Sequence, residues 1–291
     1  MMWSKDYKIK INDDGKAIKI TKYKGEKKEV QIPSHLQNLP VTAIGYEHCL
    51  LKDCHMGAFQ RKQLTRVTIP DGVRTIGDFA FWNNQLTSVT IPNSVIAIGY
   101  RAFDSNQLTR VTISNSVITI GSRAFEGNQL TSVTIPDRIK TIADGAFARN
   151  QLTSVTIPHG VTAIGQKAFR NNQLTDVIIP SSVTVIGWGA FANNQLTSLT
   201  IPDGVRTIES SAFENNQLIS VTIPDSITVI GWAVFRNNQI ASITIGANVR
   251  LGEEKPPVFD NGFDDFYREN GKKKGTYTYK NGHWKMQEGR L

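Results

Sequence analysis

Apolar and polar residues alternate along most of this chain in a pattern that returns every 22 residues. The unit reads approximately Q-L-T-S-V-T-I-P-D-x-V-x-x-I-G-x-x-A-F-x-N-N, with no insertion between successive copies after residue 64. A fixed period of this length predicts a repeat protein built from stacked units. One phenylalanine marks each unit, at Phe59, Phe81, Phe103, Phe125, Phe147, Phe169, Phe191, Phe213 and Phe235.

Each unit contains the signals of three local structures. In L-T-S-V-T-I the apolar residues alternate with Ser and Thr, which predicts a half-buried strand. Proline, as at Pro70 and Pro92, ends this strand because it cannot donate to a ladder. The V-x-x-I segment predicts a second short extended stretch on the opposite wall. The G-x-x-A-F-x-x-N segment predicts a single helical or 3₁₀ turn with Ala and Phe inward.

No unit can bury its Leu, Val, Ile and Phe alone, so the units must stack. The expected fold is a right-handed, curved β-solenoid of the leucine-rich-repeat type. A parallel sheet would line its concave side and short helical or 3₁₀ turns its convex side. An asparagine precedes the Gln of every regular unit, as at Asn84 and Asn106. We expect these amides to form a ladder that satisfies backbone groups at the turn.

Three segments are expected from the limits of the repeat. Residues 1–32 predict an N-terminal β cap with a hairpin around Asp13-Asp14-Gly15. Residues 33–245 form the array, whose first unit carries an insertion at about 46–58. Residues 246–291 predict a connector and a β-hairpin cap around Asn281-Gly282.

The net charge of +8 lies mostly at the ends of the chain, with +5 in residues 1–63 and only +1 in residues 64–245. The long array is therefore not a uniformly basic surface for nucleic acid. No apolar run is long enough to span a membrane, and the N-terminus has no apolar export signal. On this evidence alone a cytoplasmic location is possible. We expect a monomer.

The unit L-T-S-V-T-I-P-x-x-V-x-x-I-G-x-x-A-F resembles the BspA-like class of bacterial leucine-rich repeats, over about residues 30–245. The segment before the array is similar to that family's N-terminal cap, and the tail is similar to the segment that follows such arrays. The resemblance implies a cell-surface or secreted protein that attaches to host proteins or to other cells.

Two surfaces of the predicted solenoid are candidates for ligand binding. The strand face carries columns of Ser and Thr, which are more typical of strand pairing than of a binding hot spot. The column residues that depart from this pattern, and that we take as candidates, are Arg66, Arg110, Asp176 and Ile178.

The turn around G-x-x-A-F varies more, and it carries aromatic residues. Trp188 and Trp232 lie two turns apart, about 10 Å by strand spacing. If exposed, they would form an aromatic patch suited to protein or sugar contact; the alternative is that each indole covers its own turn. Trp82 and Tyr100 occupy the same turn in earlier units.

The insertion contains two histidines and two cysteines within eight residues: His48, Cys49, Cys54 and His55. These residue types ligate zinc, but the spacing is not that of a standard zinc finger, so a local disulfide or two free thiols are favoured over a metal site. No phosphate-binding loop, nucleophile elbow or HExxH motif occurs. We therefore expect neither an enzyme nor a cofactor.

The function that follows is protein binding, with adhesion at the cell surface as the main hypothesis and an intracellular scaffold as the alternative. A further alternative is binding of an anionic polymer by the basic N-terminal cap, set against a merely solvated cap face. The lysines of that cap are Lys5, Lys8, Lys10, Lys16, Lys19, Lys22, Lys24, Lys27 and Lys28.

Overall fold

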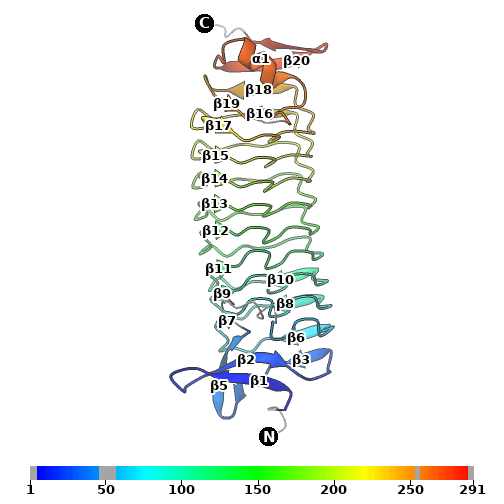
Figure 1. Cartoon of the computed structure of the whole chain (residues 1–291), viewed down its shortest axis with the longest axis vertical. Helices are drawn as coiled ribbons and strands as arrows, with labels where there is room; N and C mark the ends of the chain where they lie inside the picture. The colour runs from blue at the N-terminus through cyan, green and yellow to red at the C-terminus, as the bar shows by residue number, and fades with distance from the viewer. Residues whose placement is uncertain (1–4, 46–56, 253–255, 288–291) are drawn as a thin grey trace. The chain divides into compact units, whose positions relative to one another are not determined.

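The structure, a computed structural model of the 291-residue chain, describes residues 5–45, 57–252 and 256–287. In this part of the chain each 22-residue repeat forms one turn of a β-solenoid (Figure 1). The chain divides into two compact units. Unit 1 comprises Met1–Ile139 and Ala143–Gln151, and unit 2 comprises Lys140–Ile142 and Leu152–Leu291.

The S-V-T segment of the repeat forms short parallel strands in register. In unit 1, Arg110 lies opposite Ser88 and Thr112 lies opposite Thr90. The central residue is buried and its two neighbours are exposed, so the predicted half-buried strand is confirmed. In the middle of unit 2 this ladder is reduced to isolated bridges. The strands are β6 (Arg66–Thr68), β8 (Ser88–Thr90), β10 (Arg110–Thr112), β16 (Ser220–Thr222) and β18 (Ser242–Ile245), and the bridges join Thr156, Ile178, Thr200 and Thr222.

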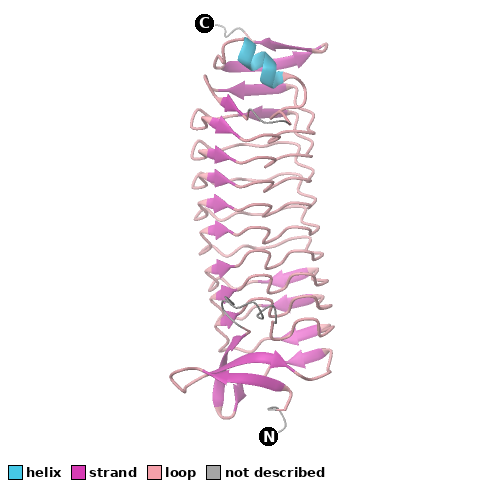
Figure 2. Cartoon of the chain, viewed as in Figure 1, coloured by secondary structure: helices cyan, strands magenta, loops and turns pink. Residues whose placement is uncertain are grey.

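The V-x-x-I segment forms the second wall, as predicted, and it carries the longer ladders (Figure 2). Each of these two-residue strands ends in a buried apolar residue, and all pair in parallel. In unit 1 they are β7 (Thr75–Ile76), β9 (Ala97–Ile98) and β11 (Thr119–Ile120). In unit 2 they are β12 (Thr141–Ile142), β13 (Ala163–Ile164), β14 (Val185–Ile186), β15 (Thr207–Ile208), β17 (Val229–Ile230) and β19 (Arg250–Leu251).

The core consists of columns of identical side chains, one from each turn. The phenylalanine rings stack on one another: Phe103 lies 5.2 Å from Phe81 and 5.4 Å from Phe125, ring centroid to centroid. In unit 2 the same stack runs from Phe169 to Phe259. Because each ring buries its faces on its neighbours, stability comes from contacts between adjacent turns.

The predicted asparagine ladder is present and is a structural feature. The Asn106 side chain is buried, and its Oδ1 accepts a hydrogen bond from the backbone N–H of Leu86 at 3.1 Å. Its Nδ2 donates to the carbonyl oxygens of Phe81 and Phe103 at 3.0 and 3.1 Å. One amide therefore joins two turns of the solenoid. The glutamine that follows each asparagine is exposed.

The G-x-x-A-F segment differs from its prediction, because the described repeats contain β-turns there in place of a helical or 3₁₀ turn. Residues two positions after the Gly column have positive φ, as at Arg101 (51°) and Lys167 (55°). The residue before each ladder asparagine also has positive φ, as at Asn83 (53°) and Ser105 (57°). These left-handed residues reverse the chain within each turn and prevent a helix from continuing.

Each end of the array has additional elements. The predicted N-terminal hairpin is confirmed by β1 (Tyr7–Ile11) and β2 (Ile18–Tyr23), followed by β3 (Glu29–Gln31), β4 (His35–Leu36) and β5 (Leu39–Ile44). The predicted C-terminal hairpin is confirmed by β20 (Gly275–Lys280) and β21 (His283–Met286). Helix α1 (Phe263–Glu269) precedes this hairpin and is not among the elements predicted from the sequence.

Candidate functional site

The turn side of unit 1 brings together aromatic side chains that lie outside the core column. Trp82 and Tyr100, both named from the sequence, are joined by Phe79, whose ring lies 5.6 Å from Trp82 and 5.2 Å from Tyr100. Both contacts are edge-to-face. All three side chains are half-buried, so they have faces or edges available at the surface.

Two arginines flank these rings. The guanidinium carbon of Arg61 lies 4.5 Å from the ring centroid of Trp82, and that of Arg101 lies 5.4 Å from the Tyr100 centroid. Cation–π attraction at such distances orients the arginines over the indole and the phenol. Together Arg61, Phe79, Trp82, Tyr100 and Arg101 form what we call the aromatic–arginine cluster.

Phe79 and the two arginines of this cluster are not among the residues predicted from the sequence. All three have positive φ (Arg61 53°, Phe79 54°, Arg101 51°). Phe79 occupies the left-handed position of the G-x-x-A-F turn, where the later repeats carry Arg, Gly, Lys, Ser or Ala. The sequence signal that could have identified Phe79 is an aromatic residue at a position where the other repeats have small or charged residues.

Arg101 is also held by a buried acid. Its Nε lies 3.4 Å from Asp104 Oδ2, and the Ser105 hydroxyl donates to Asp104 Oδ1 at 2.7 Å. Burial raises the pKa of Asp104, while the Ser105 hydrogen bond and the charge of Arg101 oppose that rise. The ion pair with Asp104 therefore helps to hold Arg101 in its place in the cluster.

The two tryptophans predicted in unit 2 lie in different surroundings. The Trp188 ring is covered by cations of the preceding turn, with Lys167 Nζ at 4.3 Å and Arg170 Cζ at 5.8 Å from its centroid. Its backbone N–H donates to Glu209 Oε2 at 2.8 Å. Trp232 is also half-buried. Whether these two rings contact a ligand stays a prediction.

The predicted residues of the strand face are all exposed. In unit 1, Arg66 of β6 and Arg110 of β10 lie on either side of Ser88 of β8. A groove of about 610 Å³ runs over this face and is lined by Arg66, Ser88 and Thr90 among others. In unit 2, Ile178 is 78% exposed in a column otherwise made of Thr, and Asp176 precedes it on the same face. These residues stay candidates for ligand contact.

The predicted His48, Cys49, Cys54 and His55 lie outside the described residues. Within residues 5–45, 57–252 and 256–287, no group of three or more His, Cys, Asp or Glu side chains is placed to hold a metal ion. None of the helices in that same part of the chain has the length and apolar composition needed to cross a membrane.

The chain matches a family model described as a BspA type leucine-rich repeat region, in six copies over residues 52–175 and 140–255. It is similar in structure to a leucine-rich repeat protein from Bacteroides ovatus ATCC 8483, with a TM-score of 0.58, 22% identity and coverage of 80% of this chain and 67% of that one. It is also similar to the pneumococcal vaccine antigen PcpA, with a TM-score of 0.50, 20% identity and coverage of 84% and 80%. No curated protein matches the chain. At these identities the solved structures establish the fold alone.

Proposed function

The chain belongs to the BspA-type leucine-rich-repeat family, and from this premise we propose that it is an adhesin that binds proteins of a host or of other cells. Leucine-rich-repeat proteins generally serve as protein-interaction modules. The finer parts of the proposal are the surface that binds and the location of the protein at the cell surface or outside the cell.

The observation that carries the proposal is the aromatic–arginine cluster. Trp, Tyr and Arg are the residue types that dominate binding energy at protein interfaces. Here Trp82 and Tyr100 are held in place by edge-to-face contacts with Phe79, so little side-chain entropy remains to be lost on binding. The strand face, in contrast, is mostly Ser and Thr, which are poor anchors.

Binding is tested with the full chain against a panel of purified extracellular-matrix and serum proteins immobilised on a sensor surface. The double variant Trp82→Ala/Tyr100→Ala should lose at least about tenfold in affinity for any protein that the wild type binds. The control is Ser122→Ala, because Ser122 occupies the position of Tyr100 one turn later. Equal affinity of the wild type and the double variant would move the binding surface away from this cluster.

Location is tested by protease treatment of intact cells that express the full-length gene. Cleavage of the chain while a cytoplasmic protein survives supports an adhesin. Protection of the chain until the cells are lysed would refute the adhesin and leave an intracellular scaffold that uses the same surface.

A further inference from the structure

The N-terminal hairpin presents lysines in pairs on one exposed face. In the register of β1 and β2, Lys8 lies opposite Lys22 and Lys10 lies opposite Lys19. Ile9 and Tyr7, which alternate with these lysines on β1, lie opposite Ile20 and Tyr23 of β2, and these two side chains are buried. The arrangement places four lysine side chains across the β1–β2 pair.

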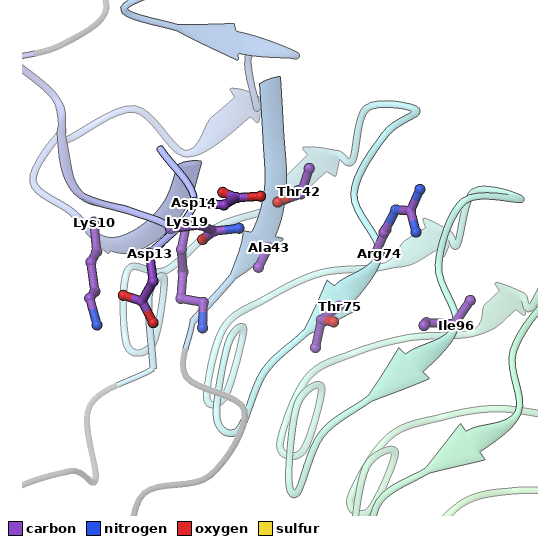
Figure 3. Close-up of a pocket in the computed structure, with 10 residues that line it drawn as sticks. Lys10, Asp13, Asp14, Lys19, Thr42, Ala43, Arg74, Thr75 and Ile96 are labelled. Atoms are coloured by element: carbon purple, nitrogen blue, oxygen red, sulfur yellow. The ribbon is translucent and has the colours of Figure 1, made fainter. Parts of the chain in front are cut away.

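This cationic face continues into the second wall of the solenoid. Lys19 of β2 lies opposite Ala43 of β5, and Ala43 lies opposite Thr75 of β7. Ala43 and Thr75 line a pocket of about 520 Å³ at this point of the wall. Figure 3 shows Lys10 and Lys19 on one side of this pocket and Arg74 on the other.

The pocket also has acidic groups, which lie on the same side as the lysines (Figure 3). Asp13 and Asp14, in the turn of the hairpin, line it together with the three cations. Asp14 Oδ1 accepts a hydrogen bond from the backbone N–H of Lys16 at 3.0 Å, which is part of the turn itself. A ligand here meets three positive and two negative groups, so a uniformly charged polyanion is a poor match.

An apolar surface lies beside the cations. Ile96 lines the pocket and is 42% exposed, and Ile118 of the next turn is 44% exposed. The two are neighbours across the wall, because the Ile118 backbone N–H donates to the Ile96 carbonyl at 2.9 Å. The same column carries Lys140, Thr162, Thr184 and Arg206 in later repeats, so this apolar pair is confined to the turns beside the pocket.

We propose that this surface, the cap groove formed by Lys10, Lys19, Ala43, Arg74, Ile96 and Ile118, binds an acidic segment of a protein partner. A carboxylate of the segment enters the pocket between the lysines and Arg74, and an apolar neighbour packs on Ile96 and Ile118. The isoleucines favour a peptide over a polysaccharide or a nucleic acid. The inference rests on the proposed protein-binding function but assigns a second surface, separate from the aromatic–arginine cluster.

The test uses the full chain and three probes: a short peptide that alternates Asp with Leu, one that alternates Asp with Ser, and inorganic polyphosphate. The wild type should bind the Asp–Leu peptide at least about tenfold more tightly than the other two. The double variant Lys10→Glu/Arg74→Glu should lose at least tenfold, and Ile118→Ser should lose severalfold. Higher salt should weaken the binding only in part, since apolar contact remains.

Arg206→Glu is the matched control, because Arg206 lies in the same V-R-T-I context as Arg74, far along the sequence from the lysine hairpin. It should bind the Asp–Leu peptide as the wild type does. An equal loss in this variant, or no preference for Asp–Leu over Asp–Ser and polyphosphate, overturns the proposal. Trp82→Ala/Tyr100→Ala should keep full peptide binding, so a failure of this inference and a failure of the proposed function give different results.

Discussion

The side-chain oxygen of Asn106 binds the backbone N–H of Leu86, twenty residues earlier in the chain, at 3.1 Å. The same relationship recurs from Asn128 to Leu108 and from Asn194 to Leu174, at 3.0 and 3.1 Å. Every such asparagine lies between two turns and satisfies backbone groups of both. Each asparagine therefore belongs to one turn of the solenoid and links it by hydrogen bonds to the turn before.

Replacing Asn106 with Ala should lower the free energy of unfolding by about 1–3 kcal/mol, because it leaves the buried Leu86 N–H without its acceptor, while the Phe81 and Phe103 carbonyls keep Asn84 and Asn128 as donors. Chemical denaturation of the full chain measures the loss. Gln107→Ala is the control: Gln107 is equally regular in the repeat but exposed, and its loss should stay within about 0.5 kcal/mol. Similar losses in both variants would contradict the ladder.

Two phenylalanines should respond differently to truncation. Phe103→Ala removes a fully buried ring from the stack and should cost about 3–5 kcal/mol of unfolding free energy. Phe79→Ala removes a half-buried ring from the aromatic–arginine cluster and should cost less than half as much. Denaturation and partner binding are measured on the same two variants, which distinguishes a loss of core packing from a loss of the binding cluster. Full binding by a stable Phe79→Ala chain would argue against the cluster.

Gly121 is required for close approach between turns rather than for its backbone conformation, since it does not have a positive φ. A Cβ at this position would lie 2.6 Å from the Gly99 carbonyl carbon and 2.7 Å from the Tyr100 nitrogen. Gly121→Ala should therefore destabilise the fold by about 1–3 kcal/mol. The repeat that carries Ala143 in this column supplies the control, because Ala143→Gly should change stability by only about 0.5–1 kcal/mol.

Stability should depend on pH through Asp264. This carboxylate is buried, and it accepts hydrogen bonds from the backbone N–H groups of Val258 and Phe259 at 2.8 and 3.1 Å. Burial raises its pKa above the ordinary value of 3.8, although the two hydrogen bonds oppose the rise. The folded state thus binds this proton more tightly than the unfolded state does, and the linkage favours folding as the pH falls.

The expected result is that the Asp264 contribution to stability declines as the pH rises from the unfolded pKa through the raised folded pKa. Unfolding free energies of the wild type and Asp264→Asn, measured across the acid range, should differ in slope within that window. Asp203→Asn, which removes an exposed carboxylate far from Asp264 in the sequence, controls for the loss of charge. The same slope in the wild type and Asp264→Asn would show that this group does not titrate there.

Much of the fold follows from local pattern. The alternation in L-T-S-V-T-I determines which side chains of the strand face inward, and stacking follows because no single unit can bury its apolar residues. The C-terminal hairpin could be predicted because Asn281 and Gly282 readily adopt the positive φ that a tight turn needs, 52° and 83° here, and Gly15 does the same in the N-terminal hairpin, at 70°. Helix α1 was missed, although acidic residues Asp264 and Asp265 in its first turn are a known signal.

The candidate sites depend more on the tertiary structure. The sequence named Trp82 and Tyr100 but not Phe79, which joins them, because the backbone turns through left-handed residues where a helical turn was expected. The lysines of the N-terminal cap were visible as a charge run. Their pairing across β1 and β2, and the pocket beside Arg74, required the strand register.

The sequence by itself determined the repeat, the inward columns and the asparagine ladder, because these depend on a period that every unit shares. Only the tertiary structure decided which exceptional side chains meet. Arg74 and Arg206 have the same local sequence, yet only Arg74 lines the pocket of the cap groove. Repeats with the same sequence differ in the residues that lie next to them. At the end of the array those residues come from elements outside the repeat, such as the β1–β2 hairpin.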